Sequence, residues 1–366
     1  MTNAEILSEI SGDDVGPLYG LLRDCSKHVK QFRALQAAVE VGLFDALDTA
    51  KTADGLSSEL GTHALVTATL CAVLEEMGLL RREQGGYANT ETSARFLRSS
   101  SPLFQGEVIR NLQNGFVFWD RLADVLRDGP IKVDAADVFE DNMVHSLAAE
   151  SLCGEVQKTI EIVLSKAPEL LQARRLLDLG GGHGLYSIAL TKRNPDLEAI
   201  VFDFGTLADD TARYIKRFRA DNVRFVAGNL FTDDFGDGYD AVFLFYSPGG
   251  KSPAVLAKIR DCLKPGGIFV AKHAYYARGE GAKDNLLDLE WNLAEFAGVG
   301  KGAHVYQFTG DLCLEDYAAS LEEHFSIVAT AETADFGVPP LAKFGDRLDS
   351  MVIVARKRGD GRGGAP

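Results

Sequence analysis

The chain has 366 residues, of which 46% are hydrophobic, and its formal net charge is −15. A chain of this length buries a large core and is expected to form two domains. The negative charge repels polyanions, so we expect neither nucleic acid nor an anionic membrane as a partner. No apolar stretch approaches about 18 residues and no signal peptide is recognisable, which predicts a soluble, cytoplasmic protein.

The five cysteines are odd in number and scattered along the chain without paired spacing. This pattern argues against a disulfide framework and against a zinc site, so we expect reduced core thiols and no metal. The cysteines are Cys25, Cys71, Cys153, Cys262 and Cys313.

Residues 34–97 show helical periodicity, and within them a glycine-rich hairpin signal stands at 85–88. Three helices followed by a short hairpin predict a winged helix. DNA binding is the obvious function, but the third helix, 62–78, has no lysine or arginine and carries Glu75 and Glu76. Such a helix cannot neutralise phosphates, so we expect a dimerisation domain. A further helical arm is expected over 103–128.

Residues 176–184 form an apolar run that ends at Asp178 and continues into a glycine-rich turn. A second apolar run ends at Asp203. Glycines let the backbone of a strand-to-helix turn approach a ligand, and an acid at the end of the next strand accepts hydrogen bonds from ribose hydroxyls. The pair predicts a nucleoside site. Leu185 stands where a dinucleotide fingerprint requires glycine, which argues against a dinucleotide.

Further apolar runs predict the remaining strands of a mostly parallel α/β sheet. The first is followed by the sequence Gly-Asn-Leu-Phe at 228–231, and the third is preceded by Lys-Pro-Gly-Gly at 264–267. The runs are 223–226, 239–245, 268–271 and 351–355.

The turn and the order of these features resemble the class I S-adenosylmethionine methyltransferases. A winged helix ahead of such a domain is similar to the plant and bacterial small-molecule O-methyltransferases. The resemblance implies a Rossmann-like fold, S-adenosyl-L-methionine as methyl donor, a small-molecule substrate and a homodimer formed by the N-terminal domain. The expected parts are a dimerisation domain at 1–110, linking helices that line the active site at 111–165, a methyltransferase domain at 166–355 and a disordered tail at 356–366.

The resemblance also implies a set of cofactor contacts at the ends of the strands. Asn229 stands where the family usually has an acid beside the adenine. An amide still offers an acceptor and donors at that place. The expected contacts are Asp178, Gly180, Gly182, Asp203, Phe204, Gly228, Asn229, Leu230, Phe231 and Phe245.

The family's general base is missing from its expected position. The family usually has His-Asp-Trp after the fourth strand, where counting back from the 264–267 turn gives Phe245-Tyr246-Ser247. The family's glutamate after the next turn falls on or next to His273. A phenyl ring accepts no proton, which disfavours the usual O-methyl transfer.

Three explanations remain: a relocated base, a lost activity, or a nucleophile that needs no deprotonation. A thioether sulfur is such a nucleophile, and positioning together with electron-rich groups would then suffice. We expect Tyr246 and His273 as catalytic residues. Substrate contacts are expected from Trp119, Met143, Tyr276, His304 and Tyr306.

Within the family, the chain resembles bacterial enzymes that S-methylate 4-methylthio-2-hydroxybutyrate during dimethylsulfoniopropionate synthesis. The resemblance implies methylation of a thioether without a general base. One alternative is O- or C-methylation of a small aromatic or pigment metabolite, with His273 or His304 as a relocated base. The other is a non-catalytic scaffold that binds S-adenosylmethionine.

Overall fold

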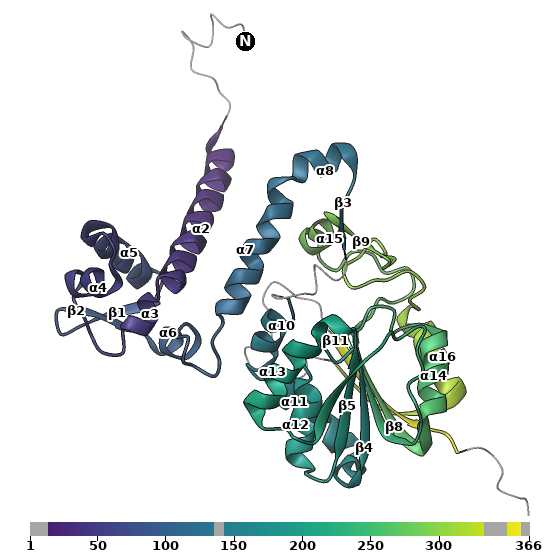
Figure 1. The fold of residues 1–366 in the computed structure, drawn as a ribbon. Helices are drawn as coiled ribbons and strands as arrows, with labels where there is room; N and C mark the ends of the chain where they lie inside the picture. The colour runs from purple at the N-terminus through teal and green to yellow at the C-terminus, as the bar shows by residue number, and fades with distance from the viewer. Residues whose placement is uncertain (1–13, 135–142, 333–349, 360–366) are drawn as a thin grey trace, which may run out of the picture. The chain divides into compact units, whose positions relative to one another are not determined.

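The computed structural model describes residues 14–134, 143–332 and 350–359. The chain forms two compact units, and it passes from the first to the second between Ile109 and Arg110 (Figure 1). The domain boundary expected at residue 110 lies one residue away. Over the described ranges, no helix combines the length and apolar character needed to cross a membrane.

The first unit is helical, with one two-stranded antiparallel hairpin. The helix expected at 62–78 is α5, and the expected hairpin pairs Leu80 with Asn89. Thr52 and Thr90 begin α4 and α6 by accepting hydrogen bonds from backbone nitrogens three residues ahead. The predicted helices and hairpin are therefore confirmed. The elements are α2 (Gly16–Glu40), α3 (Leu43–Ala46), α4 (Ala53–Leu60), α5 (Ala64–Glu76), β1 (Leu80–Glu83), β2 (Gly86–Asn89) and α6 (Glu91–Phe96).

The expected arm is two helices, α7 (Gly106–Asp120) and α8 (Leu122–Asp128). It leads into β3 (Ile131–Asp134), which pairs in parallel with the distant β9 (Ala294–Ala297). The strand that follows the arm therefore forms a separate two-stranded sheet with β9 within the second unit. Next come α10 (Met143–Ser151), α11 (Glu155–Lys166) and the 3-10 helix η1 (Pro168–Gln172).

The second unit is built on a seven-stranded sheet with the order β10-β11-β8-β7-β4-β5-β6. The pairs from β6 through β8 are all parallel, and β11 is antiparallel to both of its neighbours. Chain order reverses between β4 and β7, where open α/β sheets bind their ligands. The strands are β4 (Arg175–Leu179), β5 (Glu198–Asp203), β6 (Val223–Ala227), β7 (Tyr239–Phe245), β8 (Leu263–Ala274), β10 (Phe325–Glu332) and β11 (Ser350–Lys357).

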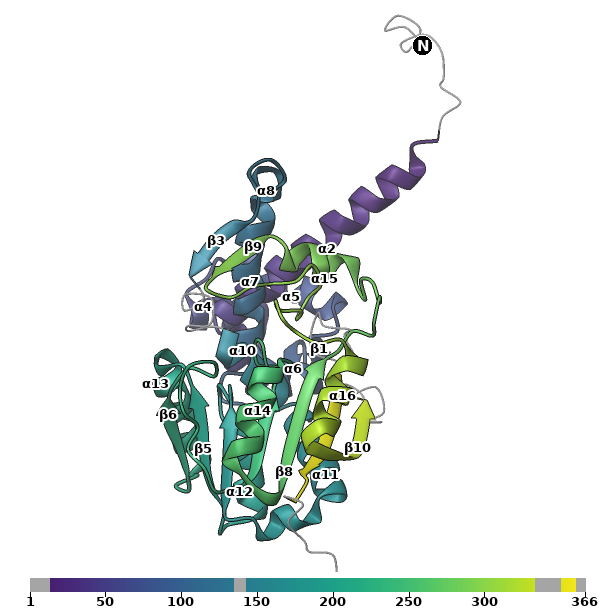
Figure 2. The same ribbon diagram turned by 90° about the vertical axis from the view of Figure 1, so that its right-hand side faces the viewer.

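Helices cover both faces of this sheet, and each face has its own hydrophobic core (Figures 1 and 2). On one face α11 packs against α12 (Leu185–Arg193), which contacts α13 (Ala208–Phe218). On the other face α14 (Pro253–Cys262) packs against α16 (Leu314–His324). Two short helices complete the unit, η2 (Gly205–Leu207) and α15 (Asn285–Trp291).

Three expectations about the chain need correction. The strand expected at 268–271 extends through Ala274, so His273 lies within β8. The last strand includes Arg356 and Lys357, which were expected in a disordered tail; residues 360–366 lie outside the described residues. Only Cys71 and Cys262 are buried core thiols, whereas Cys25 is exposed and Cys153 and Cys313 are half-buried.

Candidate active site

Asp203 joins the end of β5 to the glycine turn that follows β4. Its Oδ2 accepts a hydrogen bond from the backbone nitrogen of Gly182 at 2.8 Å, and its Oδ1 accepts one from the nitrogen of Phe204 at 2.7 Å. Burial raises the pKa of this carboxyl, and the two hydrogen bonds oppose that rise. The acid is thus held at the strand end, where the sequence predicts a nucleoside's ribose.

Asp178, at the end of β4, is a buried support for the same turn. The hydroxyl of Ser187 donates a 2.6 Å hydrogen bond to its Oδ2, and burial raises the pKa of Asp178 to about 7. A Cβ added to Gly181 would lie 2.7 Å from the Asp178 Cγ. Asp178 therefore lies behind the turn and shapes it.

The turn and the neighbouring strand ends fit S-adenosylmethionine. Gly182 has a φ of +48°, and the nearest atom to a Cβ placed there would be 3.8 Å away, on Val144. The turn therefore leaves open space at Gly182. Two phenyl rings at the ends of β5 and β6, Phe204 and Phe231, are 49% and 55% exposed. Exposed apolar rings beside an acid at a strand end are suited to an adenosyl group.

The Asn229 side chain has a local role in the turn after β6. Its Oδ1 accepts a hydrogen bond from the backbone nitrogen of Phe231 at 2.8 Å. Its Nδ2 is left to meet an adenine edge as a donor, while Oδ1 already accepts one hydrogen bond. Leu230 is buried, and a Cβ on Gly228 would lie 2.1 Å from the ring of Phe202.

Phe245 is a core residue of β7 and does not belong to the segment after the strand. Its ring stacks on Phe243 with centroids 5.0 Å apart and meets Tyr186 edge-on at 4.7 Å. Phe245 is the last residue of β7, and the segment after the strand begins at Tyr246. Residues 246–252 contain neither a histidine nor a carboxylate, so the conclusion that the usual base is missing still holds.

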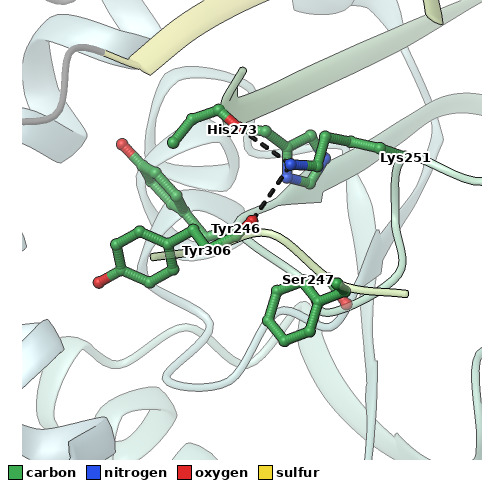
Figure 3. A pocket seen from close by; sticks show the side chains of 7 residues that line it. Tyr246, Ser247, Lys251, His273 and Tyr306 are labelled. Atoms are coloured by element: carbon green, nitrogen blue, oxygen red, sulfur yellow. Dashed lines mark hydrogen bonds between the residues drawn. The ribbon is translucent and has the colours of Figure 1, made fainter. Parts of the chain in front are cut away.

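A small cavity lies at the carboxyl ends of β7 and β8 (Figure 3). Its free volume is about 10 Å³, which is enough for about one water molecule. A methyl acceptor would therefore lie beside this cavity and not inside it. The lining residues are Tyr246, Ser247, Lys251, His273, Ala274, Tyr306 and Phe308.

Lys251 is a buried cation that ties three segments together beside the cavity. Its Nζ donates hydrogen bonds to the backbone oxygens of Ala274 and Tyr306 at 3.0 and 3.2 Å (Figure 3). It also forms a 3.1 Å ion pair with Asp311, which is nearly fully buried as well. Burial lowers the pKa of Lys251, and Asp311 opposes that change.

His273 lines the cavity as a buried, neutral imidazole. Burial, reinforced by the charge of Lys251, lowers its pKa well below the usual value. Among the described residues, its Nε2 has no hydrogen-bond partner. Its ring meets Tyr275 edge-on at 5.8 Å.

His304 forms the clearest candidate base. Its Nδ1 lies 2.7 Å from Oδ2 of Asp288, and its side chain is 26% exposed. A carboxylate only accepts hydrogen bonds, so Nδ1 carries a proton, and Nε2 is the nitrogen that can accept one in the neutral ring. The ring stacks on Tyr276 at 5.3 Å, and the Tyr276 hydroxyl donates to the backbone oxygen of Val305 at 3.1 Å.

Tyr246 and Tyr306 lie side by side with ring centroids 6.4 Å apart. Both have a left-handed backbone, with φ values of +53° and +58°. Non-glycine residues rarely adopt this conformation, and it concentrates at functional sites. The Tyr246 hydroxyl is already engaged within the protein, because it forms hydrogen bonds with the Ser350 hydroxyl at 2.5 Å and with Glu155 at 3.3 Å.

The other two predicted substrate contacts lie on linking helices. Trp119 is on α7 and donates a hydrogen bond to Glu290 of α15, an exposed residue whose carboxyl pKa is raised by partial desolvation, a change that this hydrogen bond opposes. Met143 begins α10 and is half-buried. The preceding segment, 139–142, lies outside the described residues.

Two buried ion pairs, Lys251 with Asp311 and Lys272 with Glu155, escaped the sequence analysis. Lys272 directly follows the apolar run 268–271, and this position could have indicated a buried charge. A strand that is buried on both faces also buries a charged residue that follows it. Nothing local in the sequence identifies the acidic partners. Within the described ranges, no cluster of three potential metal ligands occurs.

A glycine turn at the switch point of this sheet, closed by an acid on the neighbouring strand, defines an S-adenosylmethionine-dependent methyltransferase. Residues 24–99 match the O-methyltransferase dimerisation domain, and residues 135–304 match the O-methyltransferase domain. The chain belongs to this O-methyltransferase family and is an enzyme that uses S-adenosylmethionine as methyl donor. The scaffold alternative is thereby set aside.

Two relatives show how far the similarity extends. An uncharacterized protein of Methanocaldococcus jannaschii is 33% identical over 355 residues, covering 89% of this chain and 93% of that protein. The 3-hydroxy-5-methyl-1-naphthoate 3-O-methyltransferase of Streptomyces sahachiroi is 29% identical, covering 68% and 74%. Human N-acetylserotonin methyltransferase, solved with S-adenosylmethionine, has the same fold, with a TM-score of 0.66, 20% identity and coverage of 96% and 100%.

Proposed function

We propose that this enzyme methylates a hydroxyl group on a small aromatic molecule, with His304 as the general base. The observation that carries the proposal is the bond between His304 and Asp288. A carboxylate that fixes the Nδ1 tautomer presents Nε2 as a proton acceptor. The dyad would replace the histidine that residues 246–252 lack.

The cavity at the ends of β7 and β8 supports this proposal, because it lies between the cofactor turn and the segment that carries His304. A Cβ on Gly180 would lie 2.5 Å from the Ser247 hydroxyl, so Ser247 lies against the turn. Ser247 and Tyr306 line the same cavity, and Tyr306 follows His304 by two residues.

Bound S-adenosylmethionine supplies an electrophilic methyl group. The chain's own part would be to hold the acceptor hydroxyl in line with that methyl and to take its proton. Tyr246, Tyr306 and Trp291 offer aromatic rings beside the cavity, with Trp291 and Tyr306 centroids 6.1 Å apart. These rings suit an aromatic acceptor, and the Streptomyces sahachiroi relative is named for one.

S-methylation of a thioether such as 4-methylthio-2-hydroxybutyrate is the second candidate. It is favoured by the absence of a histidine or carboxylate in residues 246–252, since a sulfonium forms without proton loss. The substrate's carboxylate would need a cation, however. The two buried lysines near this edge, Lys251 and Lys272, are already paired with carboxylates. We therefore rank this candidate below hydroxyl methylation.

The decisive experiment offers methyl-labelled S-adenosylmethionine with matched hydroxyl and methylthio acceptors to wild-type protein and to His304→Gln. We expect labelled methoxy product and a loss of about a hundredfold in kcat in the variant. His63→Gln, at an exposed histidine of the first unit, is the matched control. Full activity of His304→Gln on a hydroxyl acceptor would reject His304 as the base.

We further propose that the first unit forms a homodimer. The domain that it matches is a dimerisation domain, and Leu18, Leu21 and Leu22 of α2 are 54%, 62% and 54% exposed. Apolar exposure of this size on one helix indicates a covered surface. Leu18→Glu with Leu22→Glu should shift the sedimenting species from dimer to monomer, and a wild-type monomer would contradict the proposal.

A further inference from the structure

Lys272 is a fully buried cation near the carboxyl end of β8, an inner strand of the sheet. It lies on β8 opposite Phe245 of β7, and its side chain is 0% exposed. Its Nζ donates hydrogen bonds to Oε1 of Glu155 at 2.5 Å and to the Thr159 hydroxyl at 2.9 Å. These two acceptors are on α11, and a third, the Tyr186 hydroxyl of α12, lies at 3.4 Å, so the lysine joins both helices to the sheet.

The same carboxylate oxygen reaches Tyr246. The Tyr246 hydroxyl donates to Oε1 of Glu155 at 3.3 Å and lies 2.5 Å from the Ser350 hydroxyl of β11. The backbone nitrogen of Tyr246 also donates to the Lys272 oxygen at 2.8 Å, and Lys272 Nζ is 5.4 Å from the ring centroid. Tyr246 is therefore held at both its backbone and its hydroxyl.

This support matters because the Tyr246 backbone has a φ of +53°. A tyrosine keeps such a conformation only where its surroundings impose it. The ring forms one wall of the cavity beside Tyr306, directly after the strand that ends at the switch point. A relaxed backbone would move this wall relative to the cofactor turn.

We propose that Lys272 is a positioning residue, which acts through Glu155 to hold the Tyr246 ring as a wall of the methyl-acceptor site. The assignment of that wall to the acceptor rests on the proposed function. Lys272 itself touches neither cofactor nor acceptor in this scheme. Its role is to hold the Glu155 carboxylate, which accepts a hydrogen bond from the Tyr246 hydroxyl, in place.

If the pair of Lys272 and Glu155 had only a structural role, its removal would have a different effect on kcat. Replacing both partners of a buried pair by apolar side chains is often neutral or stabilising, whereas removing one leaves an uncompensated charge. The paired variant Lys272→Met with Glu155→Leu therefore separates the two roles. It removes both charges and the tyrosine's carboxylate partner together.

The test measures the thermal midpoint, the affinity for S-adenosylmethionine, and kcat and KM for the best hydroxyl acceptor. We expect the paired variant to fold and to bind the cofactor within about threefold of wild type, with kcat lower by about tenfold or more. Asn194→Ala removes a buried side chain that bonds the oxygens of Leu170 and Ala173. This control should lower the midpoint and leave kcat unchanged.

A second readout needs no acceptor, so it separates this proposal from the proposed function. Protein containing 3-fluorotyrosine gives a fluorine signal for Tyr246, assigned by its loss in Tyr246→Phe. We expect this signal to shift in the paired variant and to stay in place in Asn194→Ala. A folded paired variant with unchanged kcat and an unmoved signal would overturn the proposal.

If the paired variant does not fold, Tyr246→Phe carries the kinetic test. It removes only the hydroxyl that Glu155 binds and leaves the ion pair intact. A reduced kcat with unchanged cofactor affinity supports the proposal, and wild-type kcat overturns it.

Discussion

Oδ2 of Asp203 accepts a hydrogen bond from the backbone nitrogen of Gly182 at 2.8 Å, which couples the end of β5 to the glycine turn after β4. Asp203→Ala removes this bond and the acceptor that we expect the ribose hydroxyls to use. We expect the Kd for S-adenosylmethionine, measured by calorimetry, to rise by about a hundredfold or more. Asp209→Ala, at an exposed position of α13, is the control. Wild-type affinity in Asp203→Ala would mean that the cofactor lies elsewhere.

Asp178 should make the cofactor-free protein less stable as the pH rises. Burial raises its pKa to about 7 in the folded chain, above the value of about 4 for an unfolded chain. The folded state thus holds a proton that the unfolded state has lost, and the stability due to this group declines from about pH 4 to about pH 7. In Asp178→Asn the fall in thermal midpoint over this range should be smaller. Equal falls in both proteins would contradict the assignment.

Gly181→Ala should destabilise the turn, because its Cβ would lie 2.7 Å from the Asp178 Cγ and 3.0 Å from a Val201 methyl. We expect a loss of about 1–3 kcal/mol in the free energy of unfolding, together with weaker cofactor binding. Gly20→Ala is the matched control, since nothing lies within 4 Å of its Cβ in α2. That change should stabilise the helix slightly. A wild-type unfolding curve for Gly181→Ala would show that the turn readily shifts.

Phe245→His should not restore a general base. The ring is 7% exposed and packs between Phe243 and Tyr186, so a histidine would place a polar ring in the core. We expect a loss of about 2–4 kcal/mol in urea unfolding and no gain in turnover. A marked increase in methylation of hydroxyl acceptors would show that residue 245 does reach the substrate.

The cofactor half of the site was predictable because its signals are local in sequence. A glycine turn after one strand and Asp203 after the next place their groups at one edge of a parallel sheet. The acceptor half was not predictable in the same way. Glu155 and Lys272 are 117 residues apart, and a single sequence carries no signal that pairs them.

Local contacts bear on three of the residues that the sequence had suggested. The Asn229 side chain caps its own turn, as asparagine often does, so its Oδ1 already accepts one hydrogen bond. Phe245 is the last residue of β7, and its ring stacks on Phe243. The hydroxyl of Tyr246 is similarly taken up by Ser350 and Glu155, which leaves its ring as the part that faces the cavity.

Hydroxyl methylation with His304 as the base is tested most directly by a competition experiment. Naphthol and methylthionaphthalene compete for the label of methyl-labelled S-adenosylmethionine, in the presence of either wild-type protein or His304→Gln. We expect labelled methoxynaphthalene from wild type and about a hundredfold less from the variant. Label found only in the sulfonium product, at equal rates in both proteins, would contradict it.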